Sequence, residues 1–398
     1  MARAQGRAQS AVFYASVGPE LTLYHVDVDA CTLARQGTAK MPATVQYAWR
    51  HPTEPVLYVA SSNGAAGLGG AAGDTHHATA WRIDPASGAL APHGSAVALR
   101  ARPIHLSVDR AGAFVLIAYN NPSSVSVHRL LRDGSLGEEV AQQTAPDAGI
   151  YAHQIRTTRD NATAILVTRG NDATASRPED PGALKLFRFS DGQLRGQGSV
   201  APGGGLGFGP RHLDFHPTEH WVYVSLERQS RLAVFPLNGG RLAPEPAFSI
   251  DTLAEPGTVR PKQLAGAVHV HPNGRFVYVA NRSDAMTEFQ GKPVALAEGE
   301  NNLAVFRVAA ASGEPTLIQH IATHGFHART FALDPAGRML VATNLTRRPV
   351  RDGDSVRMQP ATLAVYRVGE DGRLAFARSY DIDTGDAHQF WSGMVALA

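Results

Sequence analysis

The sequence predicts an all-β fold, a seven-bladed β-propeller of four-stranded antiparallel blades. Two observations predict it: a strand–turn–strand hairpin that recurs at a spacing of roughly 55 residues, and a second set of short turns between the recurrences. Each hairpin has a turn rich in Pro, Asp, Asn or Gly, followed by alternating β-branched and aromatic residues, which is typical of a strand. A fixed period of this kind indicates a repeat architecture rather than two β-sandwiches, the alternative fold.

The first element of each blade is the recurring hairpin, which occurs six times. In chain order the copies are HPTEPVLYVASS (51–62), DRAGAFVLIAYN (109–120), TRDNATAILVTR (158–169), HPTEHWVYVSLE (216–227), HPNGRFVYVANR (271–282) and DPAGRMLVATNL (334–345). A further strand follows each copy, for example RLAVFPL (231–237), and a two-residue turn then leads into a fourth strand. Seven such turns are present: Asp29-Ala30, Ser87-Gly88, Asp133-Gly134, Asp191-Gly192, Gly239-Gly240, Ser312-Gly313 and Asp371-Gly372.

Seven turns against six hairpins leave one blade divided between the two chain ends. We expect QFWSGMVAL (389–397) to supply its inner strand and AVFYASV (11–17) the next strand. Pairing the ends closes the ring and removes free sheet edges. The prediction is a single propeller domain over 1–398, with residues 1–10 as a flexible tail and no need for a helix.

The longest irregular stretches are expected at one face of the propeller. All four follow the second strand of a blade: 63–77, 171–182, 283–301 and 346–360. The Gly-rich stretch 201–209 precedes a first strand, so it belongs to the same face. The opposite face has only tight turns, where His51, His216 and His271 each precede a Pro or a Pro-containing turn and are interpreted as turn caps. Function is expected at the face with long loops, because variable loops on a rigid scaffold carry most binding sites.

Composition excludes several classes of function. The 398 residues carry a net charge of +2 without a basic cluster, so no nucleic-acid partner is expected. No apolar run approaches the roughly 20 residues of a membrane span, and the N-terminus lacks the apolar segment of a signal peptide. The single cysteine, Cys31, rules out a disulfide framework and indicates a reducing, cytoplasmic location. No Cys/His spacing typical of a metal site is present, so no metal and no cofactor are predicted.

Aligning the hairpins places charged residues at the mouth of the central channel. The first-strand positions are Gln46, Ile104, His153, Arg211, Gly266 and Arg329, and the second-strand positions are Ser62, Asn120, Arg169, Glu227, Arg282 and Leu345. Charge falls on consecutive blades, which predicts an anion-binding and acid–base site. Taken alone, each arginine is also compatible with a solvated strand end. Arg211 and Glu227 together are also compatible with a plain cross-strand ion pair.

The sequence resembles the lactonase family of seven-bladed propellers over essentially its whole length. The similarity lies in GPRHLDFHPTEHWVYVSLE (209–227), VHVHPNGRFVYVANR (268–282) and ARTFALDPAGRMLVATN (328–344). The family includes a bacterial 6-phosphogluconolactonase and a fungal carboxy-cis,cis-muconate cyclase. The resemblance to the cyclase implies an active-site group that falls on His153, Arg211, Glu227 and Arg282. The blade with TRDNATAILVTRG (158–170) departs from the family pattern, and the loops are unusually long.

Three functions from different classes follow. In the first, a sugar-derived anionic lactone is hydrolysed: Arg282 and Arg329, with Arg169, bind the anion, Glu227 or His153 moves the proton, and Arg211 stabilises the oxyanion. In the second, the same residues act in a cycloisomerase on a carboxylated muconate. In the third, the propeller is a scaffold without catalysis, which would favour an exposed apolar patch over a charged channel. The predicted partner is therefore a small anionic lactone or carboxylate, and the sequence predicts no oligomeric state.

Overall fold

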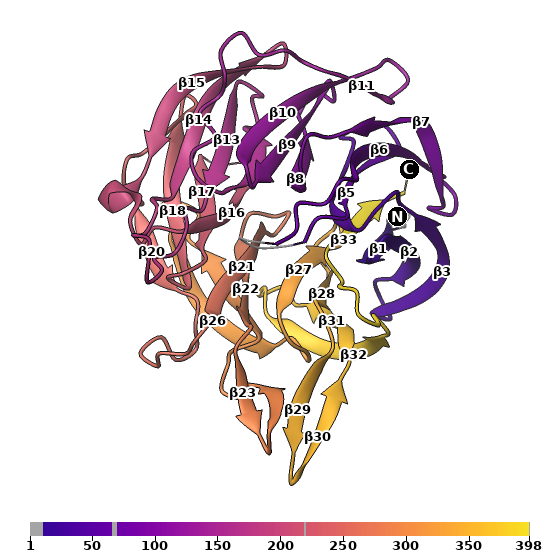
Figure 1. Cartoon of the computed structure of the whole chain (residues 1–398), viewed down its shortest axis with the longest axis vertical. Coiled ribbons are helices and arrows are strands. Elements are labelled where there is room, and N and C mark those ends of the chain that lie inside the picture. Colours follow the sequence, from indigo (N-terminus) through magenta and orange to yellow (C-terminus); the bar gives the residue numbers. More distant parts are fainter. Residues whose placement is uncertain (1–10, 66–69, 219, 398) are drawn as a thin grey trace, which may run out of the picture.

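Seven antiparallel sheets surround a central channel in the computed structural model, which describes residues 11–65, 70–218 and 220–397 (Figure 1). The expected all-β, seven-bladed propeller is confirmed. The expected flexible tail, residues 1–10, lies outside the described residues. Blades are numbered here along the chain, and in each the strand named first lies innermost.

The strands have the following bounds. Blade 1 contains β4 (Val45–Arg50), β5 (Val56–Ser62), β6 (His76–Ile83) and β7 (Leu90–Ala98), and blade 2 contains β8 (Pro103–Val108), β9 (Phe114–Asn120), β10 (Ser123–Leu130) and β11 (Leu136–Glu139). Blade 3 contains β12 (Ala152–Thr157), β13 (Thr163–Thr168), β14 (Ala183–Ser190) and β15 (Gln193–Val200), and blade 4 contains β16 (Pro210–Phe215), β17 (Trp221–Leu226), β18 (Arg231–Asn238), β19 (Arg241–Leu242) and β20 (Phe248–Asp251). Blade 5 contains β21 (Gln263–Val270), β22 (Phe276–Ser283), β25 (Asn302–Val308) and β26 (Pro315–Ala322), and blade 6 contains β27 (Ala328–Leu333), β28 (Met339–Asn344), β31 (Ala361–Val368) and β32 (Leu374–Ile382). Blade 7 contains β33 (Ser392–Ala396), β1 (Ala11–Val17), β2 (Glu20–Asp27) and β3 (Thr32–Lys40).

The split blade is confirmed as blade 7. Strand β33 pairs with β1, with Val12 opposite Val395 and Tyr14 opposite Gly393. The backbone N–H of Trp391 also donates to the Ser16 hydroxyl at 2.9 Å. Both chain ends therefore belong to one sheet, and the ring is closed by strand pairing, as Figure 1 shows beside the N and C labels.

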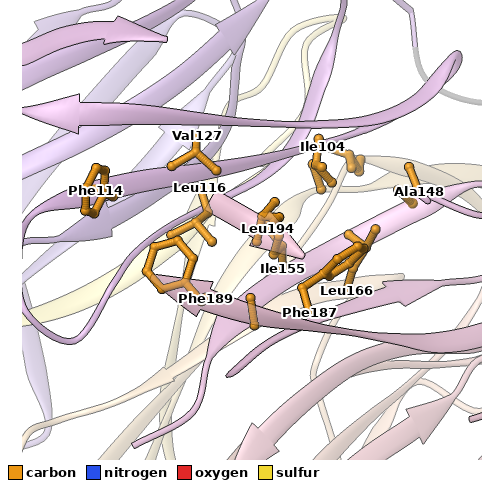
Figure 2. Packing of buried hydrophobic residues seen from close by; sticks show 14 of the residues in the cluster. Ile104, Phe114, Leu116, Val127, Ala148, Ile155, Leu166, Phe187, Phe189 and Leu194 are labelled. Atoms are coloured by element: carbon orange, nitrogen blue, oxygen red, sulfur yellow. The ribbon is translucent and has the colours of Figure 1, made fainter. Parts of the chain in front are cut away.

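Apolar faces of adjacent blades pack against each other and form the core. Figure 2 shows the cluster between blades 2 and 3, where Phe114 of β9 meets Phe189 of β14 edge to face with ring centroids 5.8 Å apart. Buried tyrosines add polar links, since the Tyr58 hydroxyl donates to the Gly134 carbonyl of the next blade at 2.8 Å. Because each such contact joins consecutive blades, the sheets are held in a fixed register around the channel.

The turn histidines also link blades, which confirms their interpretation as caps. The Nδ1 atom of His51 accepts the backbone N–H of Glu54 at 2.8 Å, and its Nε2 lies 3.0 Å from the Gly112 carbonyl in blade 2. His216 and His271 make the matching contacts to the carbonyls of Gly274 and Gly337.

Three details differ from the sequence-based expectation. The stretches 283–301 and 346–360 are not irregular, because they contain the hairpins β23 (Met286–Phe289) with β24 (Lys292–Ala295) and β29 (Arg348–Asp352) with β30 (Ser355–Gln359), which project side by side from the ring in Figure 1. A short turn of 3-10 type, η1 (Pro202–Gly205), occurs where no helix was expected, and Gly203 and Gly204 within it have non-helical, positive φ of 62° and 74°. In blade 4 the outer strand is broken into β19 and β20, with Pro244 and Pro246 between them.

Candidate active site

One buried carboxylate organises the mouth of the channel. Glu227 directly follows β17, and its side chain is 2% exposed. Its Oε1 accepts from Arg211 Nη1 of β16 at 2.5 Å and also from Arg282 Nη2 of β22. Its Oε2 accepts from Arg169 Nη1 at 3.0 Å, and Arg169 directly follows β13. Strand ends from blades 3, 4 and 5 therefore converge on a single anion.

The charge state of Glu227 follows from these neighbours. Burial by itself raises the pKa of this carboxyl, but the guanidiniums of Arg211, Arg282 and Arg169 outweigh burial and lower the pKa to about 2. Glu227 is therefore a carboxylate at neutral pH, and both of its oxygens are occupied by cations. A carboxylate held in this way is a weak base and a strong positioning group.

A water-sized cavity lies beside this cluster. It has a volume of about 10 Å³, and its walls come from inner strands and from the segment before β33. The lining residues are Tyr47, Ile104, His153, Arg211, His212, Arg329, Thr330 and Phe390. A cavity of this size holds about one water molecule. It joins the Glu227 cluster, through Arg211, to His153 and Arg329.

His153 of β12 is a neutral imidazole in this setting. Its side chain is buried, and its Nδ1 has no hydrogen-bond partner. Burial, followed by the charges of Arg211 and other neighbours, lowers the pKa of His153 well below its usual value. An unprotonated imidazole beside a water-sized cavity has the form that a general base requires.

Two arginines at the mouth have no carboxylate partner among the described residues. Arg329 of β27 lies with its guanidinium carbon 3.6 Å from the centre of the Phe390 ring, and its Nε donates to the Phe390 carbonyl at 3.2 Å. Arg102, just before β8, is 6% exposed and lies 5.5 Å from the centre of the same ring. The Nε of Arg102 is buried without a hydrogen bond. Because arginine stays protonated in proteins, these two cations leave the site with uncompensated positive charge.

The six site residues predicted from the hairpin register all lie in this region, and four more belong with them. Sequence reasoning missed Arg102, Tyr151, His327 and Phe390. Tyr151 lies under the Arg169 guanidinium, 4.6 Å from its carbon, and His327 Nε2 lies 3.3 Å from Arg282 Nη1.

A backbone feature marks two of the missed residues. Tyr151 and His327 have positive φ of 58° and 59°, and each precedes a predicted mouth residue by two positions. Gly209, two positions before Arg211, has the same left-handed backbone with φ of 47°. Glycine adopts this conformation freely, whereas a residue with a side chain pays about 1 kcal/mol or more. The same register position is occupied by Arg102 in blade 2, so the large polar side chains two positions before the mouth residues were the available sequence signal.

The described residues contain no group of three or more His, Cys, Asp and Glu side chains that could hold a metal ion. They also contain no helix that is long and apolar enough to cross a membrane. The absence of a metal requirement and the cytoplasmic location stay predictions.

Comparison with known proteins gives consistent matches along the chain. Residues 13–351 match the family model described as "Lactonase, 7-bladed beta-propeller". The 6-phosphogluconolactonase of Bacillus subtilis (strain 168) is 29% identical over 332 residues, covering 81% of this chain and 83% of that protein. The 6-phosphogluconolactonase of Pectobacterium carotovorum is 27% identical over 295 residues, covering 73% and 78%. The structure of the Pseudomonas aeruginosa periplasmic gluconolactonase PpgL superposes with a TM-score of 0.73 at 23% identity, covering 98% of this chain and 100% of that one.

Proposed function

The chain belongs to the lactonase family of seven-bladed β-propellers, and on this basis we propose that it hydrolyses a sugar-derived lactone that carries an anionic group. The observation that carries the proposal is the charge arrangement at the mouth. Three arginines contact one carboxylate, two further arginines have no carboxylate partner among the described residues, and a neutral histidine lies beside a water-sized cavity. Such a site attracts an anionic substrate and can activate water.

His153 is the proposed general base. It is unprotonated, it borders the cavity, and Glu227 is too strongly held by arginines to compete for the proton. Arg211 borders the same cavity and also contacts Glu227, so it is positioned to stabilise the oxyanion that forms when water adds to the lactone carbonyl.

Glu227 is the proposed positioning residue. It orients Arg211, Arg282 and Arg169 through direct hydrogen bonds and balances part of their charge. These contacts favour Arg282 and Arg169 as members of the Glu227 cluster rather than as the main anion site.

Arg329 and Arg102 are the proposed anion site. Both contact Phe390, and neither is neutralised by a carboxylate within the described part of the chain. Two free guanidiniums match the charge of a phosphate dianion better than that of a single carboxylate. Bound phosphate would also offset the Arg329 charge that depresses the pKa of His153, so substrate binding strengthens the base.

The test is a substrate panel with purified protein. We would compare a 6-phosphorylated aldonolactone, the same lactone without phosphate, and a carboxylated muconate, each with the wild type and with His153→Gln. We expect the wild type to hydrolyse the phosphorylated lactone in preference to the other two compounds. We expect His153→Gln to abolish this hydrolysis. Lactone formation from the muconate would instead support a cycloisomerase, and inactivity on all three would favour a binding scaffold.

A further inference from the structure

His212 borders two separate cavities along the channel. Together with Tyr47 and Thr330 it lines both the 10 Å³ cavity at the mouth and a second cavity of about 330 Å³ below it. This lower chamber extends to Pro272 and Asp334, in the tight turns at the opposite face of the propeller. His212 therefore lies at the boundary between the proposed active site and a route to the far face.

The His212 ring is poised to exchange a proton. Its ring centroid lies 5.0 Å from that of His153, and both rings border the water-sized cavity. In the described residues no side-chain hydrogen bond or ion pair engages the His212 ring, whereas the turn histidine His51 is held by hydrogen bonds. One water in the cavity is sufficient to connect His153 with His212.

The proposed reaction requires a proton to leave the site in every turnover. Water loses a proton to His153 as its oxygen bonds to the lactone carbonyl carbon. The ring C–O bond then breaks, and the departing alkoxide takes the proton back from His153. The product carboxylic acid then gives its O–H proton to the neutral His153 and becomes a carboxylate, so His153 is left with one proton to release for each lactone opened.

Charge disfavours release of this proton through the mouth. On that side the proton must pass Arg102, Arg211 and Arg329 while the substrate occupies the opening. Below His212 the charges are balanced, because Asp214 pairs with Arg156 at 2.6 Å, and Arg50 and Asp334 both line the chamber. The chamber is also large enough for several water molecules.

We propose that His212 is a relay residue that passes the proton released by lactone hydrolysis from His153, through one bridging water, to the water of the lower chamber. In this transfer an N–H bond of His153 breaks as one forms at His212, and His212 then releases its proton to chamber water. The proposal rests on the lactonase function proposed above.

The groups around His212 support this role. His153 and His105 have ring centroids 5.0 Å and 6.4 Å away, Tyr47 and His269 share the lower chamber, and Arg211 and Arg329 share the mouth cavity. Burial, then Arg211, His105, Arg329 and His269, lower the pKa of His212 well below its usual value. The ring is therefore unprotonated between turnovers, can accept a proton, and returns it quickly to water.

The experiment compares wild type, His212→Gln and His212→Asn with His25→Gln, a matched change at an exposed histidine of β2. Hydrolysis of the phosphorylated lactone is measured at low buffer concentration, with and without added imidazole, after thermal melting has shown that each protein is folded. We expect kcat to fall about tenfold or more in the His212 variants, KM to stay within about twofold, and imidazole to restore much of kcat. His25→Gln should match the wild type.

The outcomes separate the relay from the function on which it rests. Wild-type protein without lactonase activity overturns the proposed function. Active wild type with unchanged kcat in the His212 variants, or with a loss that imidazole does not restore, overturns the relay alone. If neither His212 variant folds, His212 is a structural residue and the relay is likewise overturned.

Discussion

Arg211 and Glu227 face each other across the inner hairpin of blade 4, with Nη1 of the arginine 2.5 Å from Oε1 of the carboxylate and both side chains buried. The pair is not an isolated cross-strand ion pair, because Arg282 shares the same oxygen and Arg169 occupies the other. One anion thus holds three cations from three blades, and this relationship determines how the mouth responds to pH and to mutation.

The first prediction concerns stability against pH. The pKa of Glu227 is lowered from 4.5 to about 2 on folding, so the native state holds this proton less tightly than the unfolded state. The resulting stabilisation, about 3 kcal/mol, is present above pH 4.5 and is lost as the pH falls toward 2. Urea unfolding between pH 7 and pH 3 should show about 2 kcal/mol of this loss in the wild type.

Glu227→Gln should remove most of that pH dependence. The variant should also be less stable at pH 7 by about 3 kcal/mol or more, because three buried guanidiniums lose their counter-charge. Equal stability of both proteins at pH 7 would contradict the clamp role of Glu227. A kcat loss of about 10²–10⁴-fold is expected as well, since Arg211 is no longer held in place.

The second prediction concerns the base. His153→Gln should lower kcat on the phosphorylated lactone by about 10²–10⁴-fold with little change in KM. Since the pKa of His153 in the free protein lies well below 6.5, kcat/KM should stay high as the pH falls through 6.5. Bound phosphate offsets the Arg329 charge, so the acid limb of kcat should lie at higher pH than that of kcat/KM. Steady-state rates from pH 4 to 8 test the order of the two limbs.

The third prediction concerns anion recognition. Arg329→Ala and Arg102→Ala should each raise KM for the phosphorylated lactone by about tenfold or more, because each removes a charge-assisted contact. The decrease in kcat should be smaller than this increase in KM. KM for the lactone without phosphate should change little. The exposed Arg378, far from the mouth, provides the control Arg378→Ala. Equal effects on both lactones would place the phosphate elsewhere.

The fourth prediction is that the reaction needs no metal. The arginines at the mouth repel a cation, and their number exceeds that of the nearby carboxylates. Dialysis against EDTA should leave kcat unchanged. Loss of activity that calcium or zinc restores would point to a metal-dependent mechanism.

The fifth prediction concerns ring closure. Deleting residues from Gln389 onward removes β33 and the preceding Trp391, whose N–H donates to Ser16, and exposes the edge of β1. The truncated chain should aggregate or melt at a much lower temperature. Size-exclusion chromatography and thermal melting measure this. A soluble, monomeric truncation of wild-type stability would argue against strand pairing as the closing element.

The sequence by itself determined the architecture of the propeller. Strand alternation and turn chemistry are local properties, so the repeat of HPTEHWVYVSLE-like hairpins was sufficient to predict seven blades, the split blade and its two terminal strands. Repeat register also brought His153, Arg211, Glu227 and Arg282 to one end of the channel, because equivalent strand ends lie at the same face. The loops were less predictable, since hairpins such as β23–β24 form within segments that lack the main repeat.

Only the tertiary structure decided which charges compensate each other. Register places Arg282 and Arg329 at the same mouth of the channel, but it cannot show that Arg282 is bound to Glu227 whereas Arg329 lies on the Phe390 ring. Arg102 joined the site through its contact with Phe390 before β33, and Tyr151 through a left-handed backbone; strand alternation encodes neither feature. The physical reason is distance along the chain: a strand forms from neighbouring residues, whereas the net charge of the site depends on side chains that meet only after the ring has closed.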